Sequence, residues 1–227
     1  MARVPLWKLR RLAPRAKRVI ERRRADAPVI AAYEHTVIPA AEQYMAAYDR
    51  ATQMRGSWKL EGQERQKAVA ALAVALQCWS PLVIRDVESF DGSAFRQTSV
   101  PDDLIHDAQY IVDLVVEHAA RADAPLRYQE ALTLEMNERL RAARKEHTEA
   151  ETADKDYQQC LADVRAKAQA LQTELTTFRR TLAALLGRSD KDYQKLRLER
   201  ASHRDEDDDP AAPTLPGDGE DIPADAG

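Results

Sequence analysis

Apolar residues recur at helical spacing along most of this chain, and the strictest pattern lies in its C-terminal half. Between residues 157 and 187 an apolar side chain falls alternately at every fourth and every third position. These steps keep the side chains on one face of an α-helix, as in the heptads of a coiled coil. We name this stripe the seam; its large members are Tyr157, Leu161, Val164, Leu171, Leu175, Phe178, Leu182 and Leu185.

The seam belongs to a predicted helix that runs from Pro125 to Gly187, because no proline or glycine interrupts the sequence between them. A helix of roughly 60 residues is about 90 Å long at 1.5 Å per residue. The seam continues in phase toward the N-terminal end of this helix, but residues 143–154 place His147 and Asp154 in it. We expect this weaker stretch to set the register of packing or to allow a bend.

Further helices are predicted between Asp26 and residue 123. Pro28 follows Asp26 in the order typical of a helix start, and Pro39 predicts a kink near residues 35–39 because the apolar pattern resumes in phase after it. Residues 66–79 are apolar around most of the helix circumference, a pattern that indicates a helix covered on several sides. A turn is expected at residues 90–93, before a last helix of this region.

These elements predict an all-α protein with an elongated antiparallel helical bundle or coiled coil. Its parts are a basic amphipathic arm (residues 1–25), the kinked helices of the bundle (26–123), the long heptad-bearing helix (124–200) and a disordered acidic tail (201–227). Bulky aromatic residues at one heptad position and alanine at the other suit an antiparallel or bundle partner better than a parallel zipper. That partner could be residues 28–90, a second copy, or another protein.

Composition agrees with a helical protein, since 7 Gly and 3 Phe are few for 227 residues. The net charge of −4 conceals an uneven distribution along the chain. Residues 1–24 hold ten Lys or Arg and one Glu, which gives +9, whereas residues 201–227 hold nine acids and one Arg, which gives −8. The acidic segment is also rich in proline and glycine and poor in apolar residues, so we expect it to be disordered.

The basic arm is the candidate contact for an anionic partner. Drawn as a helix, it groups its apolar side chains on one side, as in helices that lie on anionic membranes, although Pro14 would interrupt it. The same charge could bind nucleic acid without sequence preference, or it could contact the acidic tail or a neighbouring subunit. The contact residues would be Trp7, Lys8, Arg10, Arg11, Arg15, Lys17, Arg18, Arg22, Arg23 and Arg24.

Chemistry-bearing motifs are sparse, and we predict no catalytic residue, cofactor, metal site or small-molecule substrate. The chain lacks Glu-x-x-His pairs and phosphate-binding glycine loops. Cys78 and Cys160 fall inside apolar helical patterns, which predict buried thiols in a reducing compartment.

Arg141 and His147 have the Arg-x4–6-His spacing of the helical HEPN ribonucleases, a resemblance that implies RNA cleavage. Ala142 stands where those enzymes usually have a polar residue.

Taken together, the patterns favour a non-enzymatic helical scaffold or adaptor that self-associates or docks a protein partner through coiled-coil faces. The alternative is a membrane-surface module that uses the basic arm; long kinked helices after an amphipathic leader resemble, in outline, the membrane-curving BAR-type dimers. Nucleic-acid binding and HEPN-like cleavage are further alternatives. We expect a cytoplasmic protein, peripheral to a membrane if the arm binds lipid, because the apolar run at 68–76 is shorter than the roughly 20 residues that span a bilayer.

Overall fold

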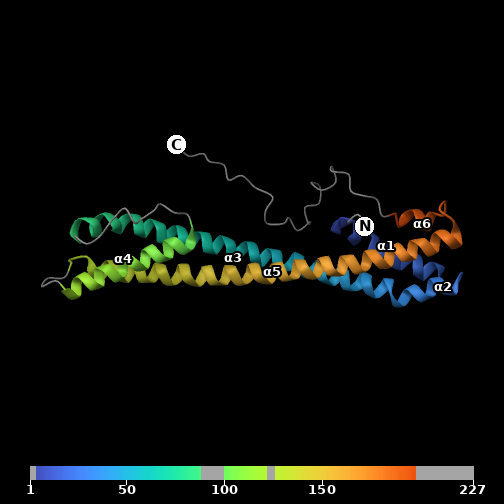
Figure 1. The fold of residues 1–227 in the computed structure, drawn as a ribbon, viewed down its shortest axis with the longest axis horizontal. Helices are drawn as coiled ribbons and strands as arrows, with labels where there is room; N and C mark the ends of the chain where they lie inside the picture. Colours follow the sequence, from blue (N-terminus) through green and yellow to red (C-terminus); the bar gives the residue numbers. More distant parts are fainter. Residues whose placement is uncertain (1–3, 88–99, 122–125, 198–227) are drawn as a thin grey trace, which may run out of the picture. The chain divides into compact units, whose positions relative to one another are not determined.

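The structure, a computed structural model, describes residues 4–87, 100–121 and 126–197, and its regular elements are all helical (Figure 1). The predicted all-α class is confirmed, with no strand in these described ranges. The predicted turn at residues 90–93 and the acidic tail at 201–227 lie outside them. The helices are α1 (Leu6–Arg23), α2 (Pro28–Ala31), the 3-10 helix η1 (Ala32–His35), α3 (Val37–Asp86), α4 (Pro101–Arg121), α5 (Gln129–Leu186) and α6 (Lys191–Lys195).

The long C-terminal helix is confirmed as α5, which has 58 residues. It ends where the sequence predicts, because Gly187 adopts a positive φ of 80°, a backbone conformation that glycine reaches without strain. The expected kink near residues 35–39 is present as a change of helix type. η1 ends at His35, and α3 begins at Val37 with Pro39 in its first turn, where the missing N–H of proline breaks no helical hydrogen bond.

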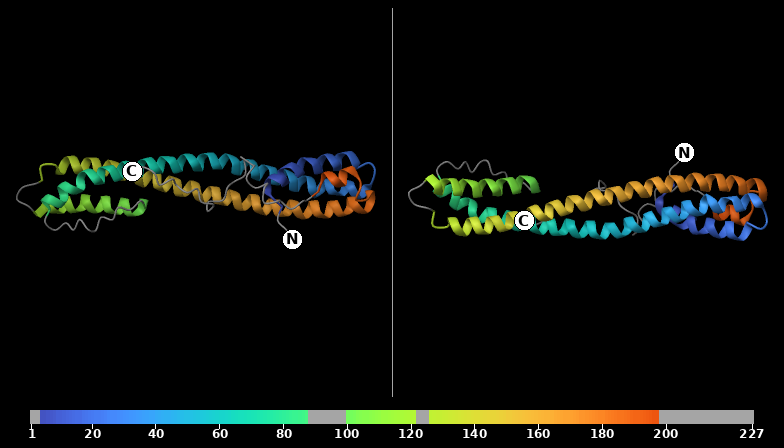
Figure 2. Two further views of the ribbon diagram at one scale, coloured as in Figure 1. Left: turned by 90° about the horizontal axis from the view of Figure 1, so that it is seen from above. Right: turned by 90° about the horizontal axis from the view of Figure 1, so that it is seen from below.

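The described chain forms two compact units, and α3 and α5 each contribute a segment to both. Unit 1 comprises residues 1–55 and 156–227, and unit 2 comprises residues 56–155. In unit 1, α1 and α6 lie beside the start of α3 and the end of α5 (Figures 1 and 2). In unit 2, α4 lies beside the end of α3 and the start of α5. Helices from distant parts of the sequence therefore build each core.

The core of unit 1 is built on the seam. All the seam residues named above except Leu185 are at most 2% exposed. The ring of Tyr33 packs on Phe178 with centroids 4.9 Å apart, and its hydroxyl lies 2.7 Å from Thr181 Oγ1. The amphipathic arm supplies the other large share of this core through α1, whose buried residues are Leu9, Leu12, Ala13, Ala16, Val19 and Ile20.

The core of unit 2 is formed by three helices. Its buried residues include Leu72, Leu76 and Val83 of α3, Ile111 and Val115 of α4, and Leu132, Met136 and Leu140 of α5. At its edge Trp79 packs on Tyr128, with ring centroids 6.0 Å apart, and donates a hydrogen bond from Nε1 to Glu135 Oε2 at 3.0 Å. The partly buried indole thus keeps its polar atom hydrogen-bonded.

The polar stretch of α5 keeps the phase of the seam, as the sequence predicts. Ala143 and Ala150 are buried, and the two polar positions find partners on other helices of unit 2. Trp58 of α3 donates from Nε1 to Asp154 Oδ1 at 3.1 Å, and His147 Nε2 lies 3.0 Å from Asp102 Oδ1 of α4. The hydrogen bond from Trp58 and the close contact of His147 with Asp102 thus take the place of apolar contacts at these two positions.

Leu171→Asp and Leu185→Asp make a matched test of the seam. Leu171 is fully buried whereas Leu185 is 47% exposed. We expect Leu171→Asp to lower the free energy of unfolding by at least about 3 kcal/mol, because it leaves a cavity and a buried carboxylate. Leu185→Asp should cost no more than about 0.5 kcal/mol. Urea unfolding followed by circular dichroism checks both, and equal effects would contradict the packing of unit 1.

Candidate functional site

The seam is not a free docking face in the isolated chain. Its buried members are covered by helices of the same chain, so a partner could reach them only if unit 1 opened. Leu185, at the end of α5, is the exposed member. Contacts with other molecules must therefore be sought on other surfaces of the described residues.

The basic arm is part of unit 1 as α1, and Pro14 lies inside this helix without ending it. Its apolar side chains, which a membrane would need, are buried in the core of the unit. Trp7 is half-buried at the start of the helix, with the guanidinium carbon of Arg11 5.1 Å from its ring centroid. Insertion of this face into lipid would require α1 to leave the protein.

Several cations of α1 form ion pairs with acids elsewhere in unit 1. Arg10 lies 3.5 Å from Asp49, Lys17 lies 2.9 Å from Glu42, and Arg24, just after the helix, lies 3.1 Å from Glu34. Arg22 and Arg23 both bind the carboxylate of Asp192 in α6. Much of the positive charge of the arm is therefore balanced within the unit.

Three other arginines, Arg11, Arg15 and Arg18, are exposed on α1. They follow one another in steps of four and three, so they share one face, and Lys8 and Arg22 extend the same spacing at its two ends. We name Arg11, Arg15 and Arg18 the basic face. This arrangement can attract an anionic surface by charge without insertion of apolar side chains.

Asp192 is the electrostatic centre of unit 1, since its side chain is only 3% exposed. Arg23 donates from Nε to Asp192 Oδ2 at 2.8 Å, and Arg22 and Lys195 lie on the other oxygen. Burial alone would raise the pKa of Asp192, but the hydrogen bond from Arg23 and the charges of Arg22, Arg23 and Lys195 outweigh it and lower the pKa. This cluster holds α6 against α1.

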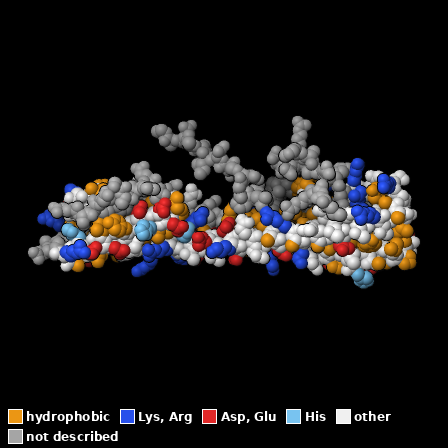
Figure 3. Space-filling model, viewed as in Figure 1, with side chains coloured by type: hydrophobic (Ala, Val, Ile, Leu, Met, Phe, Trp, Pro, Cys, Tyr) orange, Lys and Arg blue, Asp and Glu red, His pale blue; other side chains and the backbone are white. Residues whose placement is uncertain are grey.

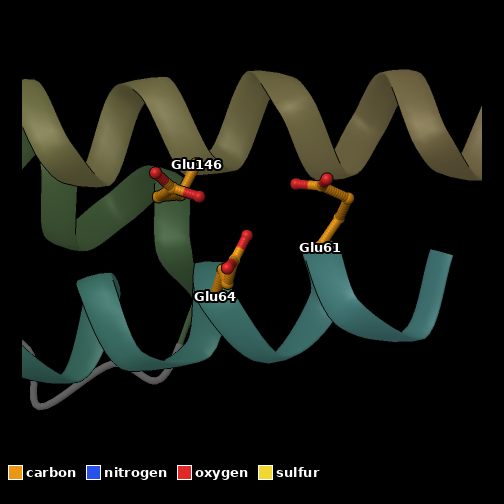
Figure 4. Close-up of side chains that lie close together, drawn as sticks. All are labelled: Glu61, Glu64 and Glu146. Atoms are coloured by element: carbon orange, nitrogen blue, oxygen red, sulfur yellow. The ribbon is translucent and has the colours of Figure 1, made fainter. Parts of the chain in front are cut away.

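A group of three carboxylates lies in unit 2, where Glu61 and Glu64 of α3 face Glu146 of α5 (Figure 4). One carboxylate oxygen of each lies within 4.8 Å of the others. Such oxygens are the ligands that hard cations such as Ca²⁺ and Mg²⁺ prefer. Lys145 Nζ lies 3.0 Å from Glu146 and supplies positive charge next to the group. Exposed acids often cluster without a metal, so the group by itself assigns no metal site.

The two residues of the ribonuclease-like spacing are not brought together. Arg141 is exposed on α5, and His147 is six residues further along, so their side chains point about 120° apart around the helix. His147 is partly buried, and its Nε2 faces Asp102 and Glu151. Around them, over α4 and the first half of α5, acidic and basic side chains are interspersed on the surface (Figure 3).

The C-terminal part of α3 carries a second apolar face that the sequence analysis placed inside a bundle. α4 and α5 pack beside this segment (Figure 1), and several of its other side chains are exposed. We name these exposed residues the outer strip; it comprises Ala70, Val74, Gln77, Cys78, Pro81 and Ile84. Val74 is 59% exposed and Ile84 is 47% exposed. The expectation that Cys78 is buried was wrong, whereas Cys160 is half-buried.

Residues 68–84, which contain the outer strip, include no Asp, Glu, Lys or Arg. Among the described residues, one helical stretch, Pro28–Asp86, is by length and composition apolar enough to cross a membrane. Only 28% of its most apolar window is buried. The core helix of a bundle meets the same criterion of length and composition, but most residues of a core helix are buried, whereas most of this window is not.

Comparisons with protein-family models, with curated proteins and with solved structures found no match to this chain.

Asp192→Asn tests the cluster that joins α1 to α6. We expect the variant to lose about 1.5–3 kcal/mol of stability at neutral pH, the range for hydrogen bonds to charged groups. Because the folded state lowers the pKa of Asp192 below its ordinary 3.8, the stabilisation is present above that value. It is lost as the pH falls through the lowered pKa, so the deficit of the variant should shrink at acid pH.

Urea unfolding of both proteins near neutral pH and near pH 3 measures this change. Asp49→Asn is the matched control, because it removes an exposed ion pair with Arg10 that should contribute no more than about 1 kcal/mol. A deficit for Asp192→Asn that is the same at both pH values would contradict the electrostatic origin of its effect.

Proposed function

We propose that this protein is a non-enzymatic helical scaffold or adaptor that docks a protein partner through the outer strip of α3. The observation that carries the proposal is the exposure of Val74 and Ile84 in a segment without charged residues. An apolar helix face in water is costly, and a partner that covers it gains the hydrophobic free energy that the single chain leaves unused.

The regular 4-3 spacing of the outer strip supports a helix as the partner's binding element. Ala70, Val74, Gln77, Pro81 and Ile84 follow one another in steps of four, three, four and three. This spacing is the one that packs along a second helix in a coiled coil. The protein would act in the cytoplasm, where Cys78 on this surface would stay reduced.

A photo-crosslinking amino acid at position 74 tests for a protein partner in the cells that make this protein. Irradiation should give discrete covalent adducts from position 74, because a docked helix would lie within reach of this side chain. Position 138 is a control, since Glu138 is exposed on α5 outside the outer strip. The proposal fails if position 74 gives no protein adduct, or the same adducts as position 138.

The basic face of α1 favours a second candidate function, the binding of an anionic membrane surface by charge. Replacement of Arg11, Arg15 and Arg18 by Gln should abolish flotation of the full chain with vesicles that contain phosphatidylserine. Each basic residue near such a surface contributes roughly 1 kcal/mol. The same replacement at Arg127, Arg139 and Arg141, which are also exposed, removes equal charge elsewhere and should leave flotation unchanged.

Flotation that is equal for both triple variants, or absent for the unmodified chain, would exclude the basic face as a membrane contact. A fluorescent single-stranded RNA titrated at the same salt concentration separates a general preference for polyanions from a preference for membranes, because counterion release would weaken the binding of RNA steeply with salt.

A further inference from the structure

We propose that the basic face of α1 binds an acidic segment of the same chain, residues 205–209. We name this segment, Asp-Glu-Asp-Asp-Asp, the acidic run; a spacer of seven residues separates it from Arg197, which ends the described ranges. The contact belongs to unit 1 and requires neither the outer strip nor a membrane. It therefore stands or fails independently of the proposed function.

The basic face carries positive charge that the described residues of unit 1 leave unbalanced. Arg11, Arg15 and Arg18 are exposed, and within the described ranges none of them forms an ion pair. Acids from other helices of the unit bind the cations beside this face, as Glu42 binds Lys17 at 2.9 Å. α1 itself contains a single acid, at position 21. The face is thus free to bind an anionic segment.

The chain leaves the described part of unit 1 beside one end of the basic face. Arg23 of α1 donates from Nε to Asp192 Oδ2 of α6 at 2.8 Å, and Leu196, directly after α6, is 1% exposed. Arg22, which also binds Asp192, comes next after Arg18 in the spacing of the basic face. The chain up to Leu196 is therefore held against the C-terminal end of α1.

The spacer is long enough to bring the acidic run onto the basic face. Position 205 is eight residues beyond Arg197. An extended chain of that length reaches up to about 26 Å. Arg11 and Arg22 lie about 16 Å apart along the helix axis, and five extended residues also span about 16 Å. The acidic run can therefore contact the three arginines at once, antiparallel to α1.

Several charge pairs in one contact can hold a segment that one pair would not. A single exposed ion pair contributes little, whereas a run of acids that faces several arginines forms a network. Each guanidinium can donate two parallel hydrogen bonds to one carboxylate. The tether also keeps the acidic run at an effective concentration of about 1 mM. Any anionic partner, a membrane included, must then displace the acidic run from the basic face.

A photo-crosslinking amino acid at position 14 of the full purified chain tests the contact directly. Pro14 is exposed on α1, three residues after Arg11 and four before Arg18. Irradiation at low salt should join this position to the acidic run. Trypsin releases residues 205–227 as one peptide, because no Lys or Arg follows Arg204, and mass spectrometry identifies the adduct.

Position 173 is the control for this experiment. Thr173 is exposed on α5 in unit 1, and its helix neighbours one turn away are uncharged. A mixture of unlabelled and ¹⁵N-labelled chains shows whether the two joined peptides come from one chain, as we expect. The proposal is overturned if half of the adducts combine light and heavy peptides, as random pairing between chains gives. It is also overturned if position 14 gives no adduct, or no more than position 173.

A titration measures the competition at low salt, with a fluorescent peptide of residues 201–212 added to full chains. Two tail variants each lose three Asp and one Glu. One changes the acidic run (Glu206→Gln, Asp207→Asn, Asp208→Asn, Asp209→Asn), and the other changes acids further along (Asp218→Asn, Glu220→Gln, Asp221→Asn, Asp225→Asn). The first should bind the peptide at least about tenfold more tightly than the unmodified chain, because its basic face is vacant. The second should bind like the unmodified chain.

Arg11→Gln, Arg15→Gln and Arg18→Gln, added to the first tail variant, should remove the binding of the peptide. These arginines are exposed, so every variant should keep the helical circular dichroism of the parent. Equal affinity of the two tail variants for the peptide, or binding that persists without the three arginines, overturns the proposal.

Discussion

The burial of one stripe on α5, apolar except at His147 and Asp154, is the constraint on which the rest of the structure depends. A helix of 58 residues that carries such a stripe is soluble only if other elements cover it along its length. In unit 1 the cover comes from α1, the start of α3 and α6, and in unit 2 it comes from α4 and the end of α3. The other helices are placed by the need to complete two cores around this stripe.

The periodicity of the sequence was enough to predict which side of each long helix is apolar. The seam and the inward phase of Ala143 and Ala150 follow from spacing alone, because helix geometry converts steps of three and four into a face. The end of α5 follows from the glycine at position 187. The kink expected near residues 35–39, present as the change of helix type before α3, follows from the chemistry of Pro39 in the same way. These are local properties, and a single sequence contains them.

What covers each face could not be predicted, because contacts between residues far apart in sequence leave no trace in local spacing. The sequence of the basic arm is typical of a membrane-surface helix. In the structure its apolar side is buried in unit 1, and Arg22 and Arg23 bind Asp192, about 170 residues away in sequence. The grouping of Glu61 and Glu64 with Glu146 is likewise a product of tertiary packing. Which charges are paired and which surfaces are covered therefore depend on tertiary packing.

The end of α3 shows how the two kinds of information combine. Its sequence is apolar around most of the helix, which correctly indicates that more than one side is to be covered. In the structure Leu72 and Val83 are buried in the core of unit 2, whereas Val74 and Ile84 are exposed. One of the two apolar sides of this segment is therefore covered. Any contact that covers a charge-free apolar face of this kind would remove it from water, which is favourable in free energy.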